Sequence, residues 1–375
     1  MDKKHFIPFI FILLISISLL SSVAFAYHSH YSSSSDSEHK LSPAEIYYFK
    51  NVISPILSVL ILLSLPIPFF IYLKYGREPK IKYYSHYERD LPTEDPPAIV
   101  NAICSISTKV GEADLNGFKA TIMDLINRKY LSIEEVPYEE SAYPDSIYLK
   151  INHEKDQEVL WNFEKKVMSI LSEYETDEGL VCMDLISESL YYTNSANFFY
   201  SSYKEWKKQI KEILSSDEKL KQVFSNKGDN YIKLFGVYGI VVGPSVLLLW
   251  FKYETALLIL LCIILGIVGI ICLIMPDTIG GQWTPYGREY CTQWKSFASY
   301  VEDYSLIKES PPDSIKIWNK YLVYATALGV ADNVQQGMEF YIPTKKLDNN
   351  LVYKFEKHRS YADFGDKLNK YYTIE

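Results

Sequence analysis

Two apolar runs separated by four residues constrain this chain more than any other feature of its sequence. The runs Leu234–Phe251 and Ala256–Met275 are each long enough to cross the roughly 30 Å hydrocarbon core of a bilayer. Because only residues 252–255 join them, the second run has to return to the side that the first one left. The sequence therefore predicts a transmembrane helical hairpin with both flanking segments on one side of the membrane.

The N-terminal part of the chain sets the orientation of this hairpin. Residues 1–26 have a basic start, an apolar core and an A-x-A end, which predicts a signal peptide; an uncleaved first membrane anchor is the alternative. A further apolar run, 52–73, predicts a transmembrane helix, and the basic residues that follow it mark the cytoplasmic side. We therefore expect a multi-pass protein of the cell membrane. Outside the apolar runs, the expected segments are a short Ser-rich extracytoplasmic segment 27–51, cytoplasmic segments 74–233 and 276–342, and a tail 343–375.

Several classes of function lack their sequence signatures. The membrane runs contain no Asp, Glu, Lys, Arg or His, which disfavours an ion-coupled transporter. His28, His30 and His39 follow no zinc-binding spacing, and the five cysteines form no C-x-x-C pair, as suits a reduced compartment. There is no phosphate-binding loop or nucleophile elbow. We therefore expect no catalytic, cofactor or metal site and predict that the chain is not an enzyme.

The segment 74–233 has the element order of a winged helix. Ala98–Ser107 reads as a short helix, and Asp114 is placed to cap a second helix that runs to Lys129. The alternating residues Leu131–Glu134 and Ile147–Ile151 then predict a two-stranded hairpin. Two helices followed by a hairpin predict an α+β, winged-helix-like domain.

A winged helix suggests nucleic-acid binding, but the charge of this segment disfavours it. The helix 114–129 would offer Lys119, Arg128 and Lys129 to DNA. The whole segment nevertheless has 21 Lys and Arg against 28 Asp and Glu, a net charge of −7. Because phosphate neutralisation supplies much of the affinity for DNA, a protein partner is favoured over nucleic acid.

A later helix in the same segment presents a basic stripe. Its apolar residues recur at helical spacing from Phe199 to Leu214, so one face is buried. The stripe could bind a partner or anionic lipid headgroups, or it could be a solvated helix face. Its members are Lys204, Lys207, Lys208 and Lys211.

The segment after the membrane hairpin is helical and rich in buried aromatic positions. An apolar seam at helical spacing runs from Tyr290 to Tyr304, and a second helix after Pro312 buries Trp318 and Leu322. These seams are expected to pack against the helices of 74–233. Residues at the two membrane boundaries are candidates for contact with lipid headgroups: Lys74, Arg77, Trp283 and Arg288.

Three motifs in order resemble the YciQ-like family of predicted membrane proteins, over residues 74–341. They are Tyr75-Gly-Arg-Glu-Pro79, the run from Leu91-Pro92 through Asp114-Leu115 to Glu134, and Trp283-Thr-Pro-Tyr-Gly-Arg-Glu289 with the helices after it. The resemblance implies a membrane protein of unknown function and brings no catalytic residues. The large outer domain usual in that family is reduced here to residues 27–50.

Together these patterns predict a mainly α membrane protein. A winged-helix-like cytoplasmic domain and a helical C-terminal cytoplasmic segment are joined by a transmembrane hairpin. The expected partners are the lipid bilayer and a protein, and the oligomeric state is left open. The function that fits best is a non-enzymatic envelope protein whose cytoplasmic module mediates protein–protein interaction. The alternative is a membrane-tethered regulator that binds nucleic acid through the winged helix.

Overall fold

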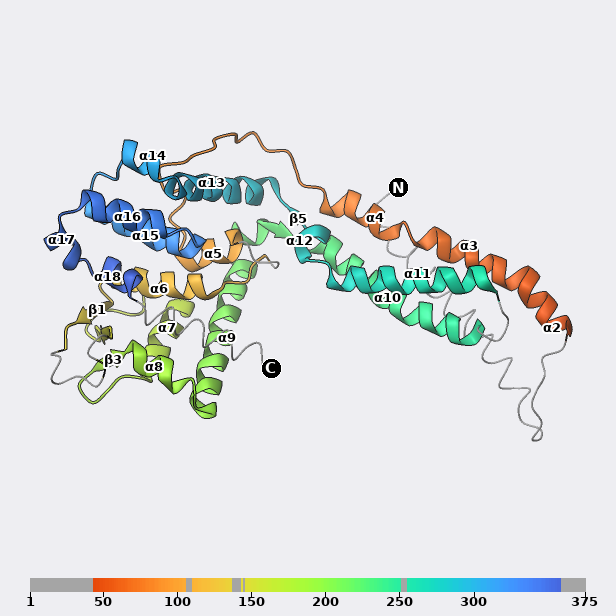
Figure 1. The fold of residues 1–375 in the computed structure, drawn as a ribbon, viewed down its shortest axis with the longest axis horizontal. Helices are drawn as coiled ribbons and strands as arrows, with labels where there is room; N and C mark the ends of the chain where they lie inside the picture. Colours follow the sequence, from red (N-terminus) through yellow and green to blue (C-terminus); the bar gives the residue numbers. More distant parts are fainter. Residues whose placement is uncertain (1–42, 106–109, 137–142, 144–145, 251–254, 359–375) are drawn as a thin grey trace. The chain divides into compact units, whose positions relative to one another are not determined.

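The computed structural model describes residues 43–105, 110–136, 143, 146–250 and 255–358, and these residues are mostly helical. The chain divides into two compact units (Figure 1). The apolar unit consists of residues up to Glu78 together with Ser225–Gln282, and the globular unit consists of Pro79–Phe224 together with the chain from Trp283 onward. The chain passes between the units after Glu78, within β4 (Phe224–Ser225) and within β5 (Gln282–Trp283). The predicted signal peptide lies outside the described residues.

A nearly continuous helical run opens the apolar unit. It consists of α2 (Pro43–Tyr48), η1 (Phe49–Ile53), α3 (Ser54–Ser64), α4 (Ile67–Ile71) and η2 (Tyr72–Gly76). Helix is therefore already present at Pro43, the first described residue, nine residues before the predicted start at Val52. The run is interrupted at Leu65 and Pro66, since proline has no N–H for the helical ladder.

The predicted hairpin is the pair α10 (Lys227–Trp250) and α11 (Ala256–Ile274), which lie against each other in Figure 1. A short helix, α12 (Asp277–Gly280), follows them. The two helices are antiparallel, because Gly236 lies opposite Leu273 and Gly243 lies opposite Cys262. Glycines let the two backbones approach closely, as small residues do between membrane helices.

The apolar unit exposes many large hydrophobic side chains. Leu63 on α3 and Leu257 on α11 are 65% and 63% exposed, whereas soluble proteins rarely expose extended apolar surface. By length and composition, two of the described helical runs could cross a membrane, Ile46–Gly76 and Ala256–Ile274. Both runs are mostly unburied, as helices surrounded by lipid would be.

The glycines of α11 allow a matched test of helix packing. A Cβ at Gly269 would lie 2.9 Å from the Gly236 carbonyl oxygen, whereas a Cβ at Gly266 would meet nothing within 4 Å. We expect Gly269→Ala to lower the unfolding free energy by about 1–3 kcal/mol, because the helices have to separate. Gly266→Ala should be neutral or slightly stabilising. Thermal unfolding of the two variants in detergent measures the difference, and equal melting temperatures would contradict this packing.

The first segment of the globular unit follows the predicted order of elements. Asp114 caps α6, accepting from the backbone N–H groups of Asn116 and Gly117 at 2.9 and 3.2 Å. β1 and β2 pair antiparallel with Leu131 opposite Ile151, so the predicted hairpin is confirmed. A third strand that the sequence did not predict, β3, pairs with β2. The elements are α5 (Pro97–Cys104), α6 (Leu115–Asn127), β1 (Leu131–Glu134), β2 (Tyr148–Ile151), α7 (Asn162–Ser172), β3 (Leu180–Cys182), α8 (Met183–Ser189), α9 (Thr193–Ser216) and η3 (Leu220–Gln222).

After β5, the elements that the structure describes in the second segment of the globular unit are all helices. The predicted aromatic seam lies on α13 as far as Val301, and Trp294 and Phe297 are fully buried there; its last residue, Tyr304, begins α14, because α13 ends at Glu302. Gly329 ends α15 in the left-handed conformation, with φ of 77°. The part of the expected tail that the structure describes contains two short helices, α17 and α18. The elements are α13 (Pro285–Glu302), α14 (Tyr304–Glu309), α15 (Ile315–Leu328), α16 (Asp332–Tyr341), α17 (Thr344–Asp348) and α18 (Leu351–Lys357).

One hydrophobic core joins the two segments of the globular unit. α15 packs on α5 and α6 (Figure 1), and side chains of both segments belong to a single buried cluster. The extended chain before α5 is held on the second segment: the Tyr290 hydroxyl donates to Asp95 at 2.9 Å and the Tyr324 hydroxyl donates to the Asp95 carbonyl at 2.8 Å. The predicted packing of the two segments agrees with this core.

Candidate functional site

The predicted basic stripe lies on α9 with three of its four lysines exposed. Lys204, Lys208 and Lys211 are exposed. Lys207 is half-buried, with its ammonium 3.9 Å from Glu112. Lys208 also lies 3.6 Å from Glu212. Because carboxylates are interspersed with the lysines, the stripe is a mixed surface and not a purely basic one.

The predicted interface residues are placed differently in the two units. In the apolar unit, the Lys74 ammonium lies 5.2 Å above the Tyr75 ring, and the Arg77 carbonyl accepts from the Gln282 amide. In the globular unit, Trp283 packs edge-to-face on Phe224 with ring centroids 5.2 Å apart. The Arg288 guanidinium donates to the Pro79 carbonyl at 2.5 Å. Trp283 and Arg288 thus contribute to the globular unit's own packing.

The start of α13 fits tightly against the chain before the hairpin. Thr284 caps this helix by accepting from the Gly287 N–H at 3.0 Å. A Cβ at Gly287 would lie 2.0 Å from the Val223 carbonyl oxygen, so only glycine fits there. The Tyr-Gly-Arg-Glu motif at 286–289 therefore has a structural role. Gly287 lets α13 approach the backbone at Val223, and Arg288 holds the backbone at Pro79.

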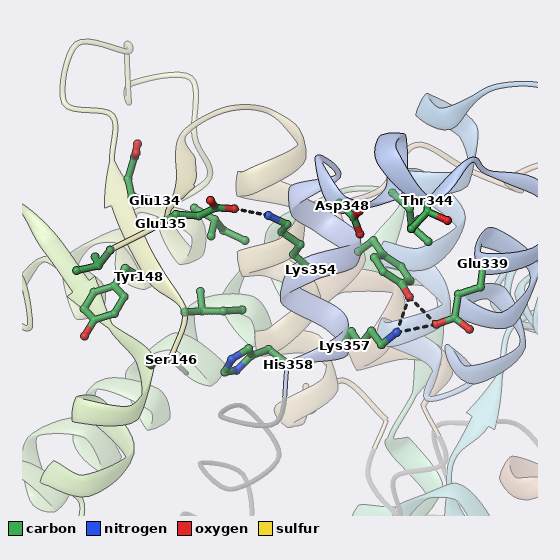
Figure 2. Close-up of a pocket in the computed structure, with 15 residues that line it drawn as sticks. Glu134, Glu135, Ser146, Tyr148, Glu339, Thr344, Asp348, Lys354, Lys357 and His358 are labelled. Atoms are coloured by element: carbon green, nitrogen blue, oxygen red, sulfur yellow. Dashed lines mark hydrogen bonds and ion pairs between the residues drawn. The ribbon is translucent and has the colours of Figure 1, made fainter. Parts of the chain in front are cut away.

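A cavity of about 600 Å³ in the globular unit is the best candidate for a binding site. One wall is formed by the end of the β1–β2 hairpin, including Glu134 and Tyr148, and the other by α16, α17 and α18 (Figure 2). The hairpin wall comes from the first segment and the helical wall from the second. The site therefore exists only when the two segments pack together.

Two ionic contacts cross or line this cavity. The Lys354 ammonium reaches from α18 to Glu135, 2.7 Å away, as Figure 2 shows. The second contact is a cluster in which Glu339 accepts from the Tyr353 hydroxyl at 2.5 Å and from Lys357 at 2.9 Å. Lys357 also donates to the Tyr353 hydroxyl oxygen at 3.0 Å. These contacts fix five polar side chains at the rim of the cavity.

The cluster keeps its ordinary protonation states at neutral pH. Hydrogen bonds from Tyr353 and Lys357 lower the pKa of Glu339, so it is a carboxylate. Burial and the Glu339 carboxylate raise the pKa of Tyr353, so it is a neutral phenol. The hydrogen bonds to Tyr353 and Glu339 raise the pKa of Lys357, so it is an ammonium. None of these three groups titrates near pH 7, which suits recognition better than proton transfer.

Local sequence explains the position of the helical wall. The Asn350 side chain caps α18 by accepting from the Tyr353 N–H at 3.2 Å, and Val352 and Phe355 anchor the helix in the core. Tyr353 and Lys357 are then four residues apart and share the face toward the cavity. This region falls within the tail expected from the sequence, residues 343–375. The Asn350 cap and the spacing of Val352 and Phe355 are the sequence signals from which α18 could have been predicted.

Among the described residues, no group of three or more His, Cys, Asp or Glu side chains is arranged to hold a metal ion. Four carboxylates and two lysines line the cavity, which gives it an excess of negative charge. Its chemistry is therefore that of an open, acidic surface with fixed charges.

Comparison with known proteins identifies a family for most of the chain. A family model described as the C-terminal domain of a predicted membrane protein (DUF2207) matches residues 84–338. No curated protein and no solved structure matches the chain. The match agrees with the resemblance seen in the sequence. It includes the hairpin wall of the cavity and ends just before Glu339.

Proposed function

We propose that this chain, which belongs to the predicted membrane protein (DUF2207) family, is a non-enzymatic multi-pass protein of the cell membrane whose globular unit binds a protein partner. In this proposal α10 and α11 form a transmembrane hairpin and the globular unit is cytoplasmic. The basic residues Lys74, in the last turn of the first helical run, and Arg77, directly after it, support that orientation. The exposed apolar side chains of α3 and α11 support a lipid environment.

The observation that carries the proposal is the cavity between the β1–β2 hairpin and α16–α18. Lys354 is paired with Glu135, and Glu339, Tyr353 and Lys357 form a cluster whose pKa values are all shifted away from neutral pH, which favours a recognition surface over an active site. Both ion pairs are partly exposed, so they can exchange partners at modest cost.

The charge of the cavity indicates the chemistry of the partner. Glu134 and Asp348 are exposed carboxylates on opposite walls, in a chain with a net charge of −8. Complementary charge speeds encounter and selects partners. We therefore propose that the cavity receives a protein segment with exposed Lys or Arg side chains.

Site-specific photo-crosslinking in native membranes tests this proposal. A photoreactive residue replaces Thr344, on the wall of the cavity, or Ser215, an exposed position on α9 that serves as the control site. We expect a protein adduct from position 344 that is absent from position 215. Mass spectrometry of the adduct should place the crosslink in a basic segment of the partner.

Charge reversal shows whether the acidic walls select the partner. Glu134→Lys combined with Asp348→Lys should reduce the adduct by roughly tenfold, since like charges then oppose the basic segment. The matched control combines Glu154→Lys with Glu178→Lys, two exposed carboxylates away from the cavity. Equal adduct yields in both double variants, or no adduct from position 344, would contradict the proposal.

The environment of α6 weighs against nucleic-acid binding through that helix. Most of its residues are buried, and α5, α7, α15 and α18 pack around it. Lys119 is paired with Glu356 at 3.0 Å, and Arg128 is paired with Asp124 and Glu164. A helix that reads a DNA groove needs an exposed basic face. Recovery of nucleic acid in place of protein at position 344 would nevertheless favour the alternative.

A further inference from the structure

Two buried cysteines from distant parts of the chain lie close enough inside the globular unit for a hydrogen bond between their thiols. Cys104 is the last residue of α5, and Cys291 lies on α13, which packs against α5. Their side chains are each 6% exposed. The Cys291 thiol donates to the carbonyl oxygen of Ile103, the neighbour of Cys104, with 3.8 Å between sulfur and oxygen. Each of the two segments that form this core therefore contributes one thiol.

The surroundings make the two thiols unequal. A hydrogen bond from the Cys104 thiol lowers the pKa of Cys291, and the Lys295 ammonium adds to this effect against the opposing effect of burial. Burial raises the pKa of Cys104, and its hydrogen bond to Cys291 raises it further. Cys291 is thus the better nucleophile, and Cys104 is the protonated neighbour that can resolve an oxidised Cys291.

We propose that Cys104 and Cys291 form a reversible dithiol–disulfide pair that hydrogen peroxide oxidises. The Cys291 thiolate attacks one peroxide oxygen, the O–O bond breaks, and the departing oxygen leaves as water after taking up a proton. The sulfur of Cys104 then attacks the resulting sulfenic acid, an S–S bond forms, and a second water leaves with the proton of Cys104. Two thiols are oxidised and one peroxide is reduced to two waters.

This pair differs from the other three cysteines of the chain. Cys182 lies on β3, where its thiol donates to the Ser146 hydroxyl, and Cys262 and Cys272 lie on α11 in the apolar unit. A disulfide between Cys104 and Cys291 would tie α5 to α13 and close a loop that contains the whole of α10 and α11. Crosslinks that close long loops constrain the unfolded chain most. Oxidation should therefore lock the two segments of the globular unit together.

The test uses the full chain in detergent, treated with hydrogen peroxide and then denatured for thiol counting. We expect the free thiols to fall from five to three, and peptide mapping without reductant should find Cys104 linked to Cys291. Dithiothreitol should restore five thiols. The oxidised chain should unfold at a higher temperature than the reduced chain.

Single variants assign the roles. Cys291→Ser should abolish the crosslink and leave Cys104 reduced, whereas Cys104→Ser should leave Cys291 as a trappable sulfenic acid. Cys182→Ser should form the crosslink as the natural chain does. A count that stays at five in the folded chain, or a crosslink between any other two cysteines, would overturn the proposal. Because the first readout uses the unsubstituted chain, a variant that fails to fold does not weaken the test.

Discussion

We expect Asn101→Asp to lower the unfolding free energy of the globular unit by about 3–5 kcal/mol at pH 7. Asn101 is fully buried on α5, and its amide donates to Asp114 at 2.7 Å and to the Ala327 carbonyl at 2.8 Å. Its side-chain oxygen accepts from the Asp114 N–H at 2.9 Å. One side chain therefore joins the cap of α6 to the end of α15.

Aspartate has nearly the shape of asparagine but offers no donor at neutral pH. In the variant, the Asp114 carboxylate and the Ala327 carbonyl would face a carboxylate oxygen in place of the amide N–H groups, so both contacts lose their donor and two negative charges lie close together. Protonation of the new carboxyl would restore one donor, so we expect the loss to shrink as the pH falls toward 4. The same substitution at Asn116, an exposed residue in the first turn of α6, should be neutral or slightly stabilising.

Tryptophan fluorescence during denaturation in detergent measures both variants. Trp206, Trp294 and Trp318 are buried in the globular unit, so its unfolding changes their emission. Equal midpoints for Asn101→Asp and Asn116→Asp would show that the amide at 101 does not hold the two segments together.

We expect Arg128→Met to lower the unfolding free energy by about 2–4 kcal/mol at pH 7. The Arg128 guanidinium pairs with Asp124 at 2.8 Å and also with Glu164, whose side chain is 2% exposed. Without the arginine, two largely buried carboxylates would lie together with no positive charge between them. The expected loss is below that of a fully buried pair because 34% of the Arg128 side chain is exposed.

The pH dependence of this loss distinguishes it from a simple packing defect. Burial raises the pKa of Glu164 and of Asp124, although Arg128 acts in the opposite direction. A carboxyl with a raised pKa in the folded state binds its proton more tightly there than in the unfolded chain. Its contribution to stability is therefore largest below the ordinary pKa and is lost as the pH rises through the raised pKa. Removal of Arg128 raises both values further, so the variant should recover stability between pH 7 and pH 5.

Measurements of stability at pH 7 and pH 5 check this expectation. Adding Glu164→Gln to Arg128→Met should recover part of the loss at pH 7, because one buried charge is gone. The control is Lys208→Met, which removes the exposed partner of Glu212 and should change stability by no more than about 0.5 kcal/mol. A loss for Arg128→Met that is the same at both pH values would contradict the electrostatic explanation.

Local patterns predicted most elements of the globular unit. The cap at Asp114, the pairing of β1 with β2 and the buried faces of α9 and α13 all follow from patterns within short stretches of chain. Sequence patterns did not predict β3 or α8. These elements have only three and seven residues, which is too few to show a regular spacing of apolar residues. The helices of 344–357 were also not predicted, because α17 and α18 have only five and seven residues.

The candidate site could not be predicted in the same way. The ion pair between Glu135 and Lys354 joins residues that are 219 positions apart, and the cavity between them depends on the packing of α18 against α6. The same holds for Cys104 and Cys291, which looked scattered along the chain. Patterns among neighbouring residues cannot reveal such pairs, because the two partners lie far apart in the sequence.

By itself, the sequence determined which stretches are apolar enough for a bilayer and which faces of the helices are buried, because both depend on the order of nearby residues. Only the tertiary structure decided which charges are paired, which lysines stay exposed and which thiols meet. These outcomes depend on how α15 and α18 pack against α5 and α6, and that packing is set by the whole shared core. The hairpin separates the two segments in sequence, and the core brings them together.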